Sequence, residues 1–117
     1  MNFKVIVAGG REFNDYSLLK KALDFYLRDR TDVVVVSGAA SGADALGERW
    51  AKENGHKIER FPADWKKYGK AAGPKRNKQM AEYADAVVVF WDGQSRGTAS
   101  MIREAKAVGL PTRIVRY

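Results

Sequence analysis

Short apolar runs alternate with amphipathic segments along the whole chain. Three runs are almost entirely apolar, at residues 3–8, 33–37 and 86–91, and two more polar runs occupy 57–61 and 112–116. Short apolar runs are typical of parallel strands that are covered on both faces. The pattern therefore predicts five strands, with 57–61 at an edge of the sheet.

The segments between these runs have the spacing of helices. Four helices are predicted, over residues 16–28, 43–54, 74–84 and 97–108. Asp15 is expected to cap the first helix and Pro74 to open the third, after a loop over 62–73. Strands that alternate with helices predict right-handed crossovers. We therefore expect an α/β, three-layer Rossmann-like fold, with a mainly parallel five-stranded sheet flanked by helices, in one domain over 1–117.

Composition narrows the chemistry of the chain. There is no cysteine and only one histidine among 117 residues, which argues against a disulfide framework and against a metal site. No apolar run approaches the length of a membrane span, and the first residues resemble a strand rather than a signal peptide, so a cytoplasmic protein without a membrane partner is expected. The formal net charge of +7 favours anionic partners, although a solvated basic surface is the simpler explanation.

Glycine and serine are concentrated where three predicted strands end, in "AGGREF", "SGAASGAD" and "WDGQSRGT". Ligands of open α/β sheets bind at the carboxyl ends of the strands, and glycine lets backbone N–H groups approach an anion closely. Turns between strands and helices also favour glycine without any ligand. The candidate ligand-binding residues in these segments are Gly9, Gly10, Arg11, Ser37, Gly38, Gly42, Ala43, Asp44, Ser95, Gly97 and Thr98.

Several side chains suggest specific roles. Arg11 can bind phosphate through its planar guanidinium, or form a surface contact with a nearby acid. Asp44 is a candidate acceptor for ribose hydroxyls and a tentative catalytic acid or base, unless it only stabilises the helix dipole. Arg76 and Asn77 are expected to point into the same cleft, where Trp65 could stack on a base or simply pack at the domain edge. Gly42→Val is expected to abolish ligand binding without disturbing the fold.

The common nucleotide motifs are missing from the chain. No Gly-Lys-Ser/Thr sequence is present, which excludes a P-loop, and Gly9-Gly10-Arg11 does not fit the G-x-G-x-x-G fingerprint. A kinase or an ordinary dehydrogenase is therefore unsupported. No cofactor is expected beyond a nucleotide-derived ligand.

Four segments in order resemble a known family. "GGREF", "SGAASGADALGERWA", "FPADWKKYGKAAGPKRNKQM" and "FWDGQSRGTASMI" together resemble the YspA/YpsA-related branch of the SLOG superfamily, which includes small phage and bacterial proteins. The resemblance covers nearly the whole chain. It implies a Rossmann-like sheet that binds nucleotides or nucleotide-derived ligands, and frequent homo-oligomers. It places the ligand edge at Gly9, Gly10, Arg11, Gly38, Gly42, Asp44, Arg76, Asn77, Ser95, Gly97 and Thr98.

One departure from the enzymes of this superfamily affects the expected activity. The phosphoribohydrolases (the cytokinin-activating LOG enzymes) carry "PGGxGTxxE", whose glutamate serves N-glycosidic cleavage. This chain retains Gly97 and Thr98 but has Met101 at the position of that glutamate. Glu104 follows one helical turn later and is expected to face elsewhere.

Three functions remain after this departure. The favoured one is a binding module that senses or sequesters a small phosphorylated nucleotide-type ligand, such as an ADP-ribose or cyclic nucleotide species. A nucleotide hydrolase is the second and would rely on Asp44. Single-stranded nucleic-acid binding is the third, suggested by the basic charge and by the more distant DprA relatives of the superfamily.

Overall fold

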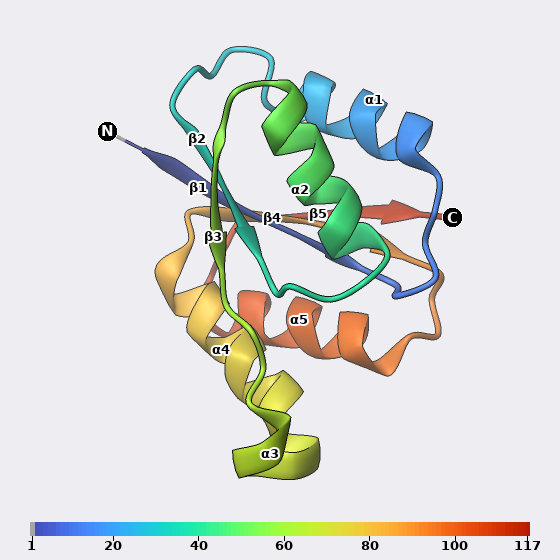
Figure 1. Cartoon of the computed structure of the whole chain (residues 1–117), viewed down its shortest axis with the longest axis vertical. Coiled ribbons are helices and arrows are strands. Elements are labelled where there is room, and N and C mark those ends of the chain that lie inside the picture. The colour runs from blue at the N-terminus through green and yellow to red at the C-terminus, as the bar shows by residue number, and fades with distance from the viewer. Residues whose placement is uncertain (1) are drawn as a thin grey trace.

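Five parallel strands in the order β3-β2-β1-β4-β5 form the centre of the molecule (Figure 1). The computed structural model describes residues 2–117. The strands are β1 (Phe3–Gly9), β2 (Val33–Ser37), β3 (Lys57–Arg60), β4 (Ala86–Trp91) and β5 (Thr112–Arg116). The helices are α1 (Tyr16–Tyr26), α2 (Ala43–Glu53), α3 (Trp65–Tyr68), α4 (Ala72–Tyr83) and α5 (Arg96–Ala107), with a 3₁₀ turn at Gly69–Ala71. This is the expected Rossmann-like α/β fold.

The apolar runs of the sequence become strands because helices cover both faces of the sheet. Along β4, Val88 and Phe90 pack under α1 and α2, whereas Val87 and Val89 pack under α4 and α5. Figure 1 shows these two helix pairs on opposite sides of the sheet. Since successive side chains of a strand point to opposite faces, a strand buried on both faces must be apolar at every position. The edge strand β3, with only Ile58 half-buried, is correspondingly polar.

The helix boundaries follow local caps. The Asp15 side chain accepts a hydrogen bond from the N–H of Leu18 at 3.0 Å, so the predicted cap of α1 is confirmed. Ser95 caps α5 in the same way, with its Oγ accepting from the N–H of Thr98 at 3.4 Å. The helices differ from the predicted ranges by one or two residues, as helix ends commonly do.

The prediction of a loop over 62–73 was wrong from Trp65 onward. Asp64 caps a short helix by accepting from the N–H of Lys67 at 3.1 Å, and the turn ends at Gly69, which has a φ of 56°. Helix α4 then begins at Ala72, so Pro74 is its third residue rather than its first. Proline is tolerated there because the first N–H groups of a helix have no partner within the helix.

The topology fixes where a ligand can bind. From β1 the chain builds outward through β2 to β3, then crosses over to β4 on the other side of β1. The crevice at such a reversal, beyond the carboxyl ends of β1 and β4, is the usual binding place in open α/β sheets. No helix within residues 2–117 is long and apolar enough to cross a membrane.

Candidate ligand-binding site

A pocket of about 650 Å³ opens at this crevice. Its floor is the end of β1, and its walls come from the loop after β2, from the first turns of α4 and α5, and from α3. The lining residues are Ala8, Gly9, Arg11, Glu12, Ala40, Asp44, Trp65, Lys70, Gly73, Pro74, Arg76, Asn77, Met80, Ser95, Arg96, Gly97, Thr98, Ser100, Met101 and Arg103. Five of these side chains are basic and two are acidic. The pocket therefore favours anions.

Nine of the residues predicted to bind a ligand line this pocket. They come from every strand exit that the sequence indicated, and from α3 and α4: Gly9, Arg11, Asp44, Trp65, Arg76, Asn77, Ser95, Gly97 and Thr98. Gly38 lies just outside, in a smaller adjoining hollow that also contains Arg11 and Arg76. The structure thus brings together groups that are up to 89 positions apart in the sequence.

Four other predicted residues line neither the pocket nor the adjoining hollow. Ser37 and Ala43 are fully buried, and Gly10 is buried beside Tyr117. Gly42 has a φ of 72°, and a Cβ there would lie 2.2 Å from the Gly10 carbonyl oxygen. The expectation that Gly42→Val leaves the fold intact was therefore wrong, because this glycine is required for the close approach of two loops.

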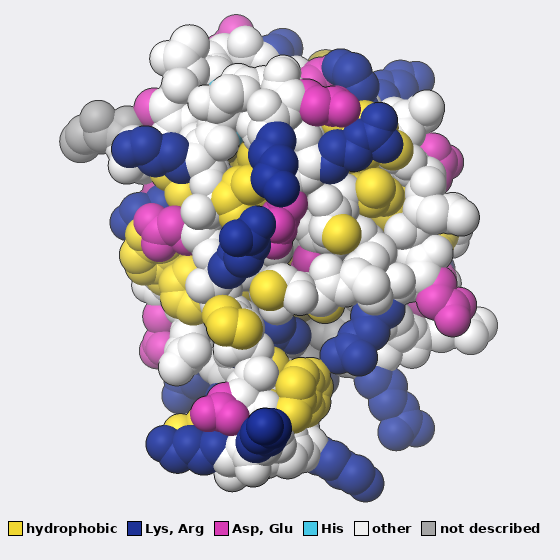
Figure 2. Space-filling model, viewed as in Figure 1, with side chains coloured by type: hydrophobic (Ala, Val, Ile, Leu, Met, Phe, Trp, Pro, Cys, Tyr) yellow, Lys and Arg dark blue, Asp and Glu magenta, His cyan; other side chains and the backbone are white. Residues whose placement is uncertain are grey.

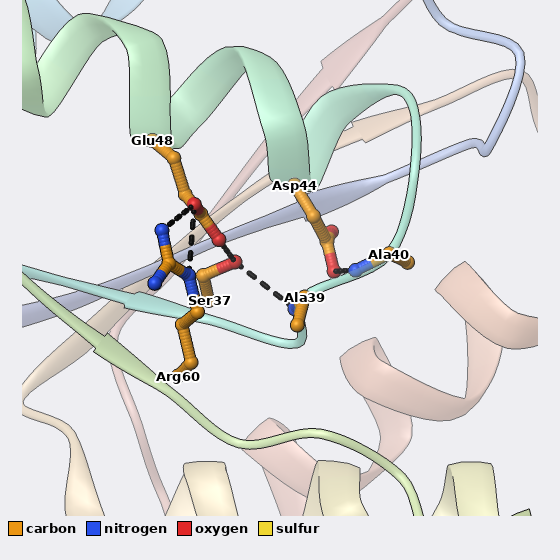
Figure 3. A network of polar contacts seen from close by, with 6 residues as sticks. All are labelled: Ser37, Ala39, Ala40, Asp44, Glu48 and Arg60. Atoms are coloured by element: carbon orange, nitrogen blue, oxygen red, sulfur yellow. Dashed lines mark hydrogen bonds and ion pairs between the residues drawn. The ribbon is translucent and has the colours of Figure 1, made fainter.

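The loop from Gly38 to Gly42 is held by hydrogen bonds from within the protein (Figure 3). Ser37 Oγ accepts from the N–H of Ala39 at 3.1 Å and donates to Glu48 Oε2 at 2.7 Å. Arg60 of β3 binds the other oxygen of Glu48 at 2.7 and 3.0 Å. These contacts hold Ala39 at a φ of 59°, an unusual value for a residue with a side chain.

Part of the backbone of this loop is therefore unavailable to an anion. The N–H of Ala40 donates to Asp44 Oδ2 at 3.3 Å, and the N–H of Ala43 donates to the Gly10 carbonyl at 3.1 Å. Together with the N–H of Ala39, three donors of the segment are occupied. Positive charge in the pocket comes instead from arginine and lysine side chains.

Arg76 occupies the centre of the site. Its Nη1 donates to the Gly38 carbonyl at 2.5 Å, and its Nε donates to Asn77 Oδ1 at 2.9 Å. Asn77 is buried, and its Nδ2 donates to Ser100 Oγ at 3.3 Å and to the Gly97 carbonyl at 3.4 Å. The guanidinium is thus fixed between the β2 exit and α5 before any ligand binds, which is the preorganisation that tight binding needs.

Asp44 is a buried carboxylate in the wall of the pocket, with 6% of its surface exposed. Burial raises its pKa from 3.8 to about 6. The N–H of Ala40 and the charges of Arg76 and Arg11 act in the opposite direction, and Glu48 adds to the increase. Asp44 can therefore accept hydrogen bonds or exchange a proton near neutral pH.

The raised pKa of Asp44 makes the stability of the protein depend on pH. The folded protein holds this proton more tightly than the unfolded chain, so the free energy of unfolding falls as the pH rises from about 4 to about 6 and is then constant. Asparagine keeps the acceptor oxygen but not the charge. We expect Asp44→Asn to be more stable than the wild type by on the order of 2 kcal/mol at pH 7.5.

Chemical denaturation of both proteins at pH 7.5 and near pH 4 measures this difference. It should shrink near pH 4, where Asp44 is neutral in the folded protein and only partly ionised in the unfolded chain, whose pKa is 3.8. A stability difference that stays the same at both pH values would contradict the shifted pKa.

The sequence reasoning missed three basic residues of the wall, Lys70, Arg96 and Arg103. Arg96 and Arg103 are seven positions apart and share one face of α5 with Ser100, so helical spacing from Thr98 onward contained the signal. Lys70 lies in the short 3₁₀ turn that was expected to be loop. Met101 is buried against the pocket, at the position where the enzymes of the superfamily have glutamate.

The aromatic residues of α3 face different hollows. Trp65 is 49% exposed and lines the pocket, with the Arg11 guanidinium 5.6 Å from its ring. Tyr68 lines a separate hollow of about 440 Å³, with Lys67 and Lys75 over its ring. Figure 2 shows basic side chains grouped at this end of the molecule. Only Trp65 is placed to stack on a ligand in the pocket.

The all-parallel sheet and the pocket at its crossover define a Rossmann-like α/β protein with an anion-attracting site. The chain belongs to the YspA, cpYpsA-related SLOG family, whose model matches residues 3–68. It is 37% identical over 115 residues to the Gene 61 protein of Mycobacterium phage D29, with 92% of each chain covered.

A solved structure also shares the fold. The chain is similar to DNA processing protein A (DprA) from Streptococcus pneumoniae, with a TM-score of 0.75 at 19% identity over 97% of this chain. It spans half the length of that DprA chain. At this identity the likeness shows the fold.

Proposed function

We propose that this protein binds a small phosphorylated nucleotide-type ligand, such as an ADP-ribose or cyclic nucleotide species, and senses or sequesters it without cleavage. The observation that carries the proposal is the pocket itself, where Arg11, Lys70, Arg76, Arg96 and Arg103 surround one cavity at the crossover of the sheet. Arginine side chains bind phosphate through paired N–H groups.

The other groups of the wall suit the rest of a nucleotide. Trp65 offers a half-exposed ring to a base, and Asp44 offers a carboxylate oxygen to sugar hydroxyls. Membership of the SLOG family is consistent with a ligand of this class. Met101 argues for binding over N-glycosidic cleavage, because a thioether cannot act as the acid or base of a hydrolase.

Mass spectrometry of ligands recovered from the protein tests this proposal. The protein is incubated with a panel of adenine and guanine nucleotides, ADP-ribose and cyclic nucleotides, washed and then denatured. We expect one compound to be recovered intact from the wild type and little of it from Arg11→Gln. Arg49→Gln, which removes the same charge from the exposed face of α2, should behave as the wild type.

The other outcomes have distinct meanings. Recovery of a free base or of ribose phosphate would show a hydrolase, and Asp44→Asn would then identify the acid or base by loss of turnover. Recovery of no compound from the panel, from a folded protein, would overturn the proposal.

A second candidate function, single-stranded nucleic-acid binding, is favoured by the surface around α3. Trp65 and Tyr68 are both exposed there, and Lys66, Lys67 and Lys70 lie on the same short segment. Exposed aromatics with basic neighbours suit stacked bases and phosphates. Affinity for a labelled oligothymidylate should then fall steeply with salt and weaken in Tyr68→Ala, whose ring lies outside the pocket. Equal affinity at low and moderate salt would exclude this function.

A further inference from the structure

Strand β5 is an outer strand of the sheet, and only one of its sides is paired. All five of its residues are in register with β4. At its two ends, the Pro111 carbonyl accepts from the N–H of Val87 at 2.9 Å, and the N–H of Tyr117 donates to the Trp91 carbonyl at 3.3 Å. Since the backbone groups of successive strand residues point to alternate sides, the odd-numbered positions of β5 face β4 and the even-numbered positions face outward.

The backbone groups that face outward are unpaired. They belong to Thr112, Ile114 and Arg116, and no other segment within residues 2–117 forms a backbone hydrogen bond with them. β5 contains no proline or glycine, and its register with β4 is continuous, so nothing interrupts this row of donors and acceptors. An open edge of this kind is a template for a further extended segment.

The side chains along this edge are basic and apolar. Arg113 and Arg116 are exposed, and neither forms an ion pair in the part of the chain that the structure describes. The Arg113 guanidinium lies 5.6 Å from the ring of Tyr26 on α1, and Phe25, which is 59% exposed, packs edge-on against Tyr26. Ile114 points to the opposite face and is 39% exposed. The edge therefore offers positive charge and apolar contacts on both faces of the strand.

The opposite edge of the sheet, at β3, has a different character. Its three charged side chains have both signs, and two of them have partners. Arg60 binds Glu48, and Glu59 accepts from the Tyr83 hydroxyl at 2.6 Å. Uncompensated charge of a single sign is thus a property of the β5 edge.

We propose that the β5 edge binds an extended acidic segment of another protein, which adds to the sheet as a sixth strand. Main-chain hydrogen bonds join this segment to the outward groups of β5, and its carboxylates meet Arg113 and Arg116. This surface lies outside the pocket, so the proposal does not depend on the proposed function.

Two other occupants suit this edge less well. A second copy of the chain carries the same net charge of +7, and pairing β5 with β5 would bring arginines together. Nucleic acid would satisfy the charge, but phosphate oxygens only accept hydrogen bonds and leave the outward carbonyls of β5 unpaired. An extended peptide supplies donors and acceptors alternately, as the edge requires.

Amide hydrogen exchange, measured by NMR on the full chain, tests this docking surface. The probe is a synthetic peptide of three Thr-Glu-Val repeats, whose spacing places glutamates on both faces of a strand, as β5 places its arginines. We expect a Kd of about 1 mM or tighter, and exchange of the Ile114 N–H slowed about 10-fold at a peptide concentration of about ten times the Kd. A peptide of three Thr-Lys-Val repeats should leave this exchange unchanged.

Arg113→Glu reverses the charge at the middle of the edge. It should weaken binding of the glutamate peptide by about 3- to 10-fold and allow the lysine peptide to bind. Lys57→Glu makes the same change at the β3 edge, where Lys57 is exposed, and should leave the binding of both peptides as in the wild type.

Several results would overturn the proposal. Equal weakening by Arg113→Glu and Lys57→Glu would mean that net charge alone attracts the peptide. Equal binding of both peptides to the wild type, or no slowing of exchange at Ile114, would show that the edge does not recognise an acidic strand. Slower exchange at Ile114 with rising protein concentration and no peptide would assign the edge to a second copy. Slowing by oligothymidylate in place of the peptide would assign it to nucleic acid.

Discussion

Arg76→Met should lower the affinity for a phosphorylated ligand by about 10- to 100-fold, the loss expected for one charge-assisted contact. Arg76 lines both the pocket and the smaller adjoining hollow, and its hydrogen bonds to Gly38 and Asn77 fix the guanidinium in place. Methionine retains much of the apolar stem and removes the charge and the donors. Calorimetric titration with the ligand recovered from the wild type measures the effect.

Two further variants separate local chemistry from net charge. Arg113→Met removes one positive charge from β5, outside the pocket, and should bind as the wild type. Arg76→Lys retains the charge without the planar fork and should bind with intermediate affinity. If Arg113→Met and Arg76→Met lost affinity equally, attraction by the overall charge would explain binding, and the proposed site would be wrong.

Gly42→Ala should destabilise the fold by roughly 2–5 kcal/mol. Two costs combine at this position. The φ of 72° disfavours any side chain, and the new Cβ would lie 2.2 Å from the Gly10 carbonyl oxygen and 2.5 Å from the backbone of Arg11. Either the loop that contains Gly10 and Arg11 or the loop that ends at Gly42 must move, and both loops border the pocket. Urea denaturation of the two proteins gives the difference in free energy of unfolding.

Gly55→Ala is the matched control. Gly55 has nearly the same φ, 70°, but a Cβ added there would meet no atom within 4 Å. It should therefore cost only the backbone strain, about 1 kcal/mol. The excess loss in Gly42→Ala then measures the contact between the two loops. Equal losses in both variants would mean that the loops adapt freely and that Gly42 is required only for its backbone angle.

The fold could be predicted from the sequence because a strand that is buried on both faces of the sheet appears in the sequence as a short, continuous apolar run. The bounds of β2, β4 and β5 agree with those expected, since strand ends coincide with changes from apolar to turn residues. Helix α3 could not be found in this way. Four residues are too few for helical periodicity, and this turn depends on the cap by Asp64 and on Gly69.

The position of the candidate site in the fold was predicted more accurately than the contacts that its residues make. Topology brings the strand exits together, so their glycine-rich turns converge. Whether a residue faces the pocket depends on alternation along the strand. Val36 packs toward α4, so Ser37 points to the other face and meets Glu48 on α2. The glycines depend on contacts across the fold, such as that of Gly42 with Gly10, which no local pattern encodes.

The position of Trp65 gives the molecule an optical reporter of its own site. Of the three tryptophans, Trp50 is buried in the core and Trp91 is half-buried outside the pocket wall, whereas Trp65 is half exposed and lines both the pocket and the smaller adjoining hollow. Emission from a water-exposed indole lies at longer wavelength than emission from a buried one. Occupancy of the site therefore changes the red part of the fluorescence spectrum, and the blue part, from Trp50, serves as an internal reference without any label.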